Sequence, residues 1–167
     1  NSFYENDYGT VSVIGTNEQI FEITTYRSEN GYSALRHPQK IAWGKSLEED
    51  VERRDFTINA MAFDIEGNLY DFHGGREDLE NKLIRAVGNA DKRFQEDALR
   101  MMRAIRIAAQ IGFLIEEKTF EAIQKNAYLI QKVSGERIRD ELFRILKVKK
   151  SGDGIRLLKS SGLLAEI

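Results

Sequence analysis

The strongest constraint on the fold lies in residues 94–109, where apolar and charged side chains recur with the period of an α-helix. At about 100° per residue, the small and apolar side chains of this segment fall within one arc of about 120°, the width of a core-facing stripe. They are Phe94, Ala98, Met101, Met102, Ile105, Ala108 and Ala109. We therefore expect one helix through this segment that buries the stripe and ends at Gly112, a natural C-terminal cap.

The opposite side of the same predicted helix is charged. Asp97, Arg100, Arg103 and Arg106 recur at intervals of three residues. This spacing sets an acid beside a base one turn away, a pair that adds about 0.2–0.5 kcal/mol to an isolated helix. For a helix considered alone, an ordinary solvated face is the preferred interpretation. Whether these residues bind something depends on the rest of the chain.

Composition limits the class of protein. The chain has 167 residues, 41% of them hydrophobic and 31% charged, which suits one compact domain or two small ones. It has no cysteine, which excludes disulfides and thiolate zinc sites, and its two histidines form no recognisable metal motif. No apolar run is long enough to span a bilayer. We expect a cytoplasmic protein with no membrane partner.

Basic residues are unevenly distributed. The net charge of −2 argues against a uniformly basic nucleic-acid-binding protein. Residues 85–106 nevertheless hold six basic residues against three acidic ones, and residues 137–150 hold six against two. Clusters of this size suit contact with phosphate groups, although ordinary helices also carry them.

The first half of the chain has the pattern of strands. Residues 10–14 and 19–26 are rich in β-branched and apolar residues around a turn, which predicts a β-hairpin. Glu22 lies in the second strand, where a carboxylate is poorly placed unless it faces water or has a function. Residues 27–46 are polar and predict a long loop. Ser46, followed by acidic residues, predicts the N-cap of a short helix.

The second half of the chain has a different residue pattern. From Arg85 onward the pattern predicts helices only, so we expect an α+β fold with a boundary near residue 87. Residues 1–87 would form a mixed β/α domain and residues 88–167 an all-α one. The sequence begins at Asn1 without an initiator methionine, and we expect it to be an excerpt of a longer protein.

Several short motifs follow one another along the chain, and their joint order and spacing are far more specific than any single motif. They are Gly9–Val11, Phe21–Arg27, Arg53–Met61, Asp71, Gly74–Gly75, Asp78–Leu79, Ile84–Arg85, Glu96–Arg100 with Arg103 and Arg106, Gly112–Phe113 and Ser134–Ile138. On these residues the chain resembles the class II tRNA nucleotidyltransferases, the CCA-adding enzymes and their poly(A) polymerase relatives. The resemblance implies part of a nucleotidyltransferase β-sheet head in residues 1–87, followed by an all-α neck and the start of the helical body in residues 88–167.

The resemblance assigns a function to the charged helix face. In that family, the Asp and first Arg of a Glu-Asp-x-x-Arg motif act as a protein template for the incoming CTP or ATP. The matching positions are Asp97 and Arg100. A carboxylate accepts a hydrogen bond from the exocyclic amine that both bases carry, and a guanidinium donates to a ring nitrogen or carbonyl. The pair would thus select the base without a nucleic-acid template.

Further site residues follow from the same resemblance. Arg54, Arg103 and Arg106 match family positions that contact the nucleotide, with Arg54 near its phosphate or sugar. Asp55 and Asn59 match a motif to which only shaping roles are assigned.

The reaction implied by the resemblance is nucleotidyl transfer, in which the tRNA 3′-hydroxyl attacks the α-phosphate and pyrophosphate leaves. Two Mg²⁺ ions would activate the attacking oxygen and neutralise developing charge. The family's Asp-x-Asp metal motif is absent from this chain, so the Mg²⁺ ligands are expected mainly upstream of it. Glu22 is a candidate third carboxylate, which cannot hold two ions alone. We expect the parent protein to be an enzyme and this chain by itself to be inactive or severely impaired.

Alternative functions remain open at this point. A poly(A) polymerase, or an enzyme that adds only CC or only A, would carry the same short motifs. In the family, a flexible segment that matches residues 27–43 helps to switch from C to A addition. Its full length in this chain favours CCA or A addition. A degenerate nucleotide- or RNA-binding module without metals is the alternative from a different class.

Overall fold

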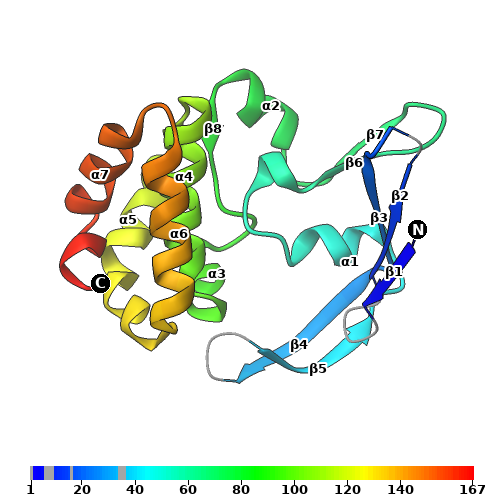
Figure 1. Ribbon diagram of the computed structural model, residues 1–167, viewed down its shortest axis with the longest axis horizontal. Helices are drawn as coiled ribbons and strands as arrows, with labels where there is room; N and C mark the ends of the chain where they lie inside the picture. Colours follow the sequence, from blue (N-terminus) through cyan, green and yellow to red (C-terminus); the bar gives the residue numbers. More distant parts are fainter. Residues whose placement is uncertain (1, 6–9, 16, 34–36) are drawn as a thin grey trace.

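The computed structural model describes residues 2–5, 10–15, 17–33 and 37–167, and it has the expected α+β fold (Figure 1). Strands and short helices of residues 2–87, here called the sheet part, lie on one side of the molecule. The helices of residues 88–167, here called the helical part, lie on the other. The described chain thus begins in a sheet at one end and finishes among helices at the other.

The elements of the sheet part are β1 (Ser2–Glu5), β2 (Thr10–Ile14), β3 (Ile20–Thr24), β4 (Arg27–Ser33), β5 (His37–Trp43), α1 (Leu47–Glu52), η2 (Thr57–Asn59), β6 (Met61–Phe63), β7 (Leu69–Asp71), α2 (Gly75–Glu80) and β8 (Leu83–Ile84). The elements of the helical part are α3 (Ala90–Glu96), α4 (Leu99–Ile111), β9 (Leu114–Ile115), α5 (Glu117–Asn126), η3 (Ala127–Lys132), α6 (Gly135–Lys147), α7 (Ser151–Ser160) and η4 (Leu163–Ala165).

The predicted hairpin is confirmed and extended. β2 and β3 pair antiparallel, with Val13 opposite Phe21 and Ser12 opposite Glu22. β1 pairs with the other edge of β2, which makes a three-stranded sheet in the order β1-β2-β3.

The prediction of a long loop over residues 27–46 is wrong for most of its described residues, because β4 and β5 form an antiparallel ribbon there. Residues 34–36 of the predicted loop lie outside the described residues. Each strand satisfies backbone groups of the other, so the segment needs no apolar pattern to become regular. Pro38 lies in β5, and both strands of a two-stranded ribbon are edge strands, the kind of strand in which proline is found.

The helix predicted after Ser46 is confirmed. The Ser46 side chain accepts a hydrogen bond from the backbone N–H of Glu49 at 3.2 Å. Glu48, Glu49 and Asp50 occupy the first turn of α1, where the helix dipole favours acids. The helix ends just before the segment that lines the site described below.

The single helix expected through residues 94–109 is broken in two. Asp97 and Ala98 separate α3 from α4, and Asp97 has an extended backbone with φ −148° and ψ 104°. Its carboxylate accepts from the backbone N–H of Leu99 at 3.1 Å, a local hydrogen bond of the kind that competes with the helical pattern. Gly112 ends α4 in the left-handed conformation with φ 73°, as predicted.

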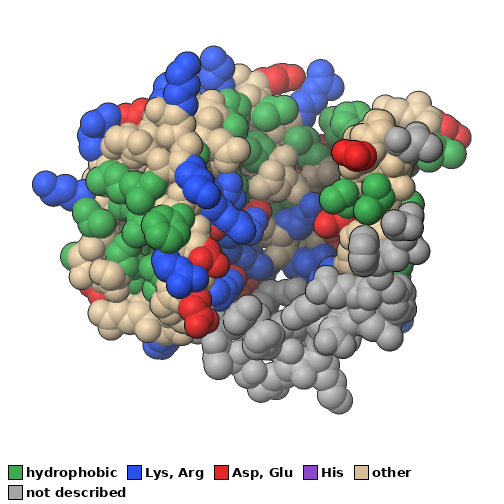
Figure 2. Space-filling model, in the orientation of Figure 1, with side chains coloured by type: hydrophobic (Ala, Val, Ile, Leu, Met, Phe, Trp, Pro, Cys, Tyr) green, Lys and Arg blue, Asp and Glu red, His purple; other side chains and the backbone are tan. Residues whose placement is uncertain are grey.

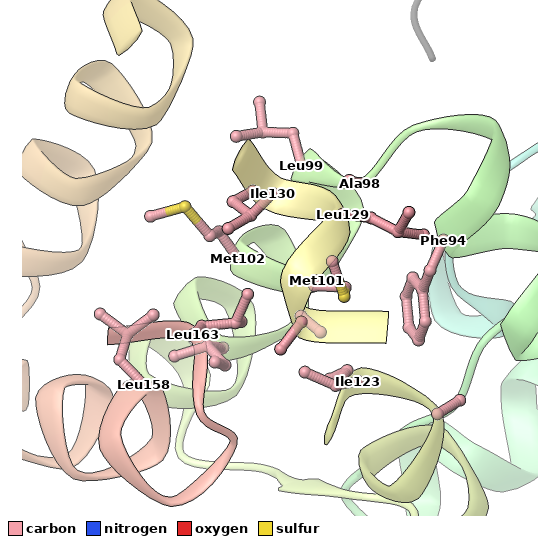
Figure 3. Close-up of a cluster of buried hydrophobic side chains, with 14 of the residues drawn as sticks. Phe94, Ala98, Leu99, Met101, Met102, Ile123, Leu129, Ile130, Leu158 and Leu163 are labelled. Carbon is pink, nitrogen blue, oxygen red and sulfur yellow. The ribbon is translucent and has the colours of Figure 1, made fainter. Parts of the chain in front are cut away.

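The apolar stripe keeps its predicted role despite the break. All seven of its residues are buried, and Figure 3 shows Met101 and Met102 among side chains from α5, η3 and α7. Phe56 and Ile84 of the sheet part belong to the same buried cluster. The two parts therefore share one core, which places α4 firmly against residues 53–59.

The helical part also contributes a short strand to the join between the parts. The expectation of helices only after Arg85 is wrong at β9, which pairs parallel with β8 of the sheet part.

No helix in the described part of the chain combines the length and apolar character needed to cross a membrane.

Candidate functional site

A hollow of about 540 Å³ lies between the two parts of the molecule. Figure 2 shows Lys and Arg side chains gathered in the recess between the helices and the sheet. The hollow takes its lining from the chain after α1, from the α3–α4 break with the start of α4, and from α6. The lining residues are Arg53, Arg54, Asp55, Asn59, Asp97, Leu99, Arg100, Arg103 and Arg137.

The charge of this lining points to an anionic ligand. Five arginines face two aspartates, which leaves a formal charge of +3. Guanidinium groups remain charged at physiological pH and present paired N–H donors that match phosphate and carboxylate oxygens. A recess of this kind concentrates positive potential and suits a phosphorylated small molecule.

Arg100 is held from several sides. Its Nη1 donates to the Glu96 carboxylate at 2.8 Å and to the Arg93 carbonyl at 3.2 Å, and its Nη2 donates to the Arg53 carbonyl at 3.0 Å. The side chain is 12% exposed. Its orientation is therefore set before any ligand arrives, which lowers the entropic cost of binding.

Glu96 connects Arg100 to a second buried arginine. Its other oxygen accepts from Arg93 Nη2 at 2.7 Å, and Arg93 Nη1 donates to the Glu52 carbonyl at 3.0 Å. Two arginines of the α3–α4 region thus bind the chain around Glu52 and Arg53. These bonds cross between the two parts of the molecule.

Asp97 has a different partner from the one suggested by helical spacing. Its Oδ2 accepts from Arg137 Nη2 at 2.8 Å, a bond to α6, 40 residues further along the chain. Its Oδ1 accepts from the Leu99 amide. A carboxylate has about four lone-pair sites, so both oxygens retain capacity for a further donor such as an amine.

Asp55 of the sheet part forms an ion pair with Arg103 of α4. Its Oδ2 accepts from Arg103 Nη2 at 2.5 Å and from Nε at 2.8 Å, and its Oδ1 accepts from the Phe56 amide at 2.9 Å. The Asn59 side chain donates to the same carboxylate at 3.4 Å. Asp55 thus holds the Arg103 side chain against the segment that contains Phe56 and Asn59.

Arg54 lies at the edge of the hollow. Its Nη1 donates to the Asn59 carbonyl at 3.0 Å and its Nη2 to Asp50 at 3.2 Å, and the side chain is 41% exposed. Asp50 also binds Arg53. Burial, the largest influence, raises the pKa of Asp50, but hydrogen bonds from Arg53, from the Arg27 amide and from Arg54 outweigh it and leave that pKa below its usual value.

Two sequence-predicted residues lie apart from this lining. Arg106 donates from Nε to Glu141 of α6 at 2.5 Å and from Nη1 to Gln110 at 2.9 Å. Glu22 is exposed on β3, opposite Ser12. The structure therefore brings together Arg54, Asp55, Asn59, Asp97, Arg100 and Arg103, and it leaves Arg106 and Glu22 outside the hollow.

The described residues do not fit a pair of metal ions. They contain no group of three or more Asp, Glu or His side chains placed to hold one. Asp55 and Asp97, the two carboxylates of the hollow, are each engaged by an arginine. The chemistry available to this lining is binding and orientation of an anionic, hydrogen-bonding ligand.

Arg53 and Arg137 also line the hollow but were absent from the predicted site residues. Both lie within motifs that the sequence analysis singled out, at Arg53–Met61 and Ser134–Ile138. Their membership of a motif was therefore the available signal. The position of Arg137 beside Asp97 depends on how α6 packs against α4, which spacing along the chain does not reveal.

Comparison with known protein families gives two matches. Residues 2–85 match the family model described as poly A polymerase head domain. Residues 112–167 match a model described as probable RNA and SrmB-binding site of polymerase A.

Individual relatives agree with these matches. The chain is 46% identical over 160 residues to a CCA-adding enzyme of Lactobacillus johnsonii, covering 96% of this chain and 40% of the relative. It is similar to the Bacillus stearothermophilus CCA-adding enzyme solved with CTP, with a TM-score of 0.84, 40% identity, and coverage of 93% of this chain and 37% of that one. A tRNA nucleotidyltransferase solved with a primer tRNA and an ATP analogue gives a TM-score of 0.83 at 29% identity, covering 100% and 46%. The chain thus spans less than half the length of each of these proteins.

Proposed function

Because the chain belongs to the poly A polymerase head-domain family, we propose that it is the nucleotide-selecting portion of a CCA-adding tRNA nucleotidyltransferase. The parent enzyme would transfer CMP and AMP from CTP and ATP to the tRNA 3′ end. The observation that carries the proposal is the arginine-rich hollow, in which Asp97 and Arg100 lie together between the two parts of the molecule.

The chemistry of the hollow suits both halves of a nucleotide. The arginines supply donors for the triphosphate. We assign Arg54, whose side chain is 41% exposed at the edge of the hollow, to the phosphate or sugar. Arg100 keeps a fixed orientation through Glu96 and two carbonyl groups. Asp97 supplies an acceptor for the exocyclic amine that cytosine and adenine share. On this proposal, Arg103 contacts the nucleotide from its place beside Asp55.

Arg106 has a different proposed role. Its ion pair with Glu141 fixes α6 against α4, and α6 carries the Arg137 that binds Asp97. We propose that Arg106 acts on the nucleotide through this packing rather than by direct contact.

The proposed domain division places a head remnant in residues 1–87 and the neck with the start of the body in residues 88–167. The end of the first family match at residue 85 supports this boundary. The body would supply contacts to tRNA, in keeping with the RNA-binding family match over residues 112–167. The tRNA substrate makes the cytoplasm the proposed location.

Mg²⁺ enters the proposal only at the level of the parent enzyme, where it would assist attack on the α-phosphate. Because the described residues do not gather a metal-ligand set, we assign this chain binding and base selection and no metal-dependent step. We accordingly expect the 167-residue chain alone to bind CTP without transferring CMP at an enzyme-like rate.

The test uses the full-length parent protein and tRNA transcripts that end before the CCA sequence, after its first C, or after both. With CTP and ATP present, each stub should be completed to CCA and extension should then stop. Long A tails would assign the protein to the poly(A) polymerases, and products that stop at CC or that start only from CC would assign it to the partial enzymes. Binding of CTP without any extension would leave only the binding module.

A further inference from the structure

Asp50 is a buried carboxylate that binds two arginines of the hollow and one backbone amide of β4. The residue is 3% exposed and belongs to α1. Its Oδ1 accepts from Arg53 Nη2 at 2.6 Å and from the backbone N–H of Arg27 at 3.1 Å. Its Oδ2 accepts from Arg54 Nη2 at 3.2 Å. One buried carboxylate therefore holds a backbone amide and two arginines that line the hollow.

The backbone amide belongs to the base of the β4–β5 ribbon. Arg27 is the first residue of β4 and pairs with Trp43 at the end of β5. The Gly44 amide donates to the Tyr26 carbonyl at 2.8 Å and closes the ribbon. A Cβ atom on Gly44 would lie 2.9 Å from the Arg27 carbonyl carbon, so the two backbones approach as closely as glycine allows. The position of the Arg27 amide is thus fixed by the ribbon base.

Through Arg53, Asp50 is also connected to Arg100, one of the two residues that we propose select the base. The Arg53 side chain binds Asp50, and the Arg53 carbonyl accepts from Arg100 Nη2 at 3.0 Å. Arg54, the second arginine on Asp50, lies at the accessible edge of the hollow. A shift of the Asp50 carboxylate therefore moves the side chains of Arg53 and Arg54 directly. It moves Arg100 indirectly, through the Arg53 carbonyl.

We propose that Asp50 is a positioning residue that couples the base of the β4–β5 ribbon to the grip of the hollow on its nucleotide. This coupling rests on the proposed function for the identity of the nucleotide, CTP or ATP. When Arg54 turns toward a bound triphosphate, the Asp50 carboxylate loses one donor and its bonds to Arg27 and Arg53 adjust. By linkage, the factor by which nucleotide binding shifts an equilibrium at the ribbon base equals the factor by which that shift changes nucleotide affinity.

Burial makes this coupling strong. Little water reaches Asp50 to replace a lost donor, so its partners compete directly for the same two oxygens. The lowered pKa of Asp50 keeps the group ionised at neutral pH, which makes its hydrogen bonds charge-assisted.

The test compares wild type with Asp50→Asn in the full-length protein. Trp43 is the only tryptophan of this chain, and its backbone pairs with Arg27 at the ribbon base, so we choose 5-fluorotryptophan at this position as the ¹⁹F NMR probe. The signal is assigned by its loss in Trp43→Phe. In wild type, CTP should shift the Trp43 resonance. In Asp50→Asn, that shift should shrink, while the KM for CTP rises about tenfold with kcat within about twofold.

A second variant perturbs the same contact from the ribbon side. Gly44→Ala places a Cβ 2.9 Å from the Arg27 carbonyl carbon, so the backbone that donates to Asp50 must shift, and the KM for CTP should rise as it does in Asp50→Asn. Two controls match these changes. Glu48→Gln removes an exposed carboxylate from the same turn of α1, and Gly135→Ala adds a Cβ where no atom lies within 4 Å, so both should leave KM and the ¹⁹F response unchanged.

The outcomes separate this inference from the proposed function. An unchanged KM in folded Asp50→Asn and Gly44→Ala, or an undiminished ¹⁹F response in Asp50→Asn, overturns the coupling. A fall in kcat without a rise in KM also overturns it, since that result places Asp50 in the chemical step. A wild type that binds CTP but adds nothing to tRNA refutes the proposed function, while the Kd for CTP and the ¹⁹F response still decide the role of Asp50.

Discussion

Glu96 shows how much of the site depends on a single side chain. Its carboxylate is shared by Arg93 and Arg100, and all three side chains are nearly buried. A group of this kind is costly to lose, because it leaves guanidinium charge in a place that water hardly reaches. Arg100 would keep only its carbonyl partners among the bonds described above.

We predict that Glu96→Gln lowers the free energy of unfolding by about 1–3 kcal/mol and weakens discrimination between bases. The amide removes the negative charge and turns an N–H₂ group toward one of the two arginines. Urea unfolding and kcat/KM for each nucleotide measure the two effects. Glu121→Gln, on the exposed face of α5, is the matched control and should change neither. Full stability together with unchanged discrimination would show that Glu96 does not set Arg100.

Among single residues, the sequence predicted which side chains lie close together better than it predicted their hydrogen-bond partners. Asp97, Arg100, Arg103, Arg54, Asp55 and Asn59 do line one hollow. The pairing of Asp97 with Arg100 suggested by helical spacing gave way to bonds with Arg137 and Glu96. Periodicity describes neighbours on one helix, whereas these bonds depend on the break at Asp97 and on the packing of α6.

At the scale of elements, Asp71 fixes the start of α2. Its carboxylate accepts from the backbone amides of Gly75 at 2.8 Å, Arg76 at 2.9 Å and His73 at 3.3 Å. Burial, the largest influence, raises the pKa of Asp71, but these amide bonds outweigh it and hold the pKa below the usual 3.8. The carboxylate therefore stabilises the folded state while it is ionised.

This geometry predicts a pH-dependent stability difference between wild type and Asp71→Ala. Because the folded pKa lies below the unfolded one, the ionic contribution is complete above about pH 5 and is lost as the pH falls through the folded pKa. Urea unfolding should show a loss of about 1 kcal/mol in the variant at pH 7, and a smaller loss at pH 3. Other carboxylates affect both proteins alike. A loss that is constant from pH 7 to pH 3 would contradict this account, and the exposed Asp140→Ala serves as control.

Element prediction succeeded where a local rule decides the structure. Ser46 and Gly112 cap helices because of their own side-chain chemistry or backbone freedom, and the apolar stripe of residues 94–109 is buried. The β4–β5 ribbon escaped prediction because its regularity comes from mutual backbone pairing rather than from an apolar pattern. Strand β9 escaped because two residues carry no readable period.

At the scale of the whole molecule, the shared core decides whether the two parts unfold separately. Phe56 belongs to the sheet part, is fully buried, and packs in the same cluster as Met101, Met102 and Ile105 of α4. The parallel pairing of β8 with β9 and the bond from Arg103 to Asp55 join the parts as well.

We therefore predict that Phe56→Ala destabilises the helical part by about 3–5 kcal/mol, although residue 56 lies outside it. The removed ring leaves a cavity beside α4. Far-UV circular dichroism during urea unfolding follows the helices directly. Phe63→Ala, which truncates a side chain that is 71% exposed, should have little effect. A helical transition unchanged by Phe56→Ala would mean that the parts fold independently.

The site as a whole was predictable only through its motifs. Its lining comes from residues 53–59, 97–103 and 137. These meet because the chain after α1 contacts α4 and because α6 packs against α4. Local spacing gives no distance between such segments. The joint order of motifs identified the family, and the folded chain then supplied the partners that motifs omit.

We propose that Asp97 and Arg100 read the base, and nucleotide discrimination by Arg100→Ala in the full-length protein tests this proposal most directly. The ratio of kcat/KM for CTP to that for UTP, measured on a tRNA that lacks CCA, should fall about 10- to 100-fold as the guanidinium donors are lost. Arg76→Ala, on an exposed side chain of α2, should leave the ratio unchanged. An unaltered ratio in folded Arg100→Ala would contradict the assignment of base reading to this pair.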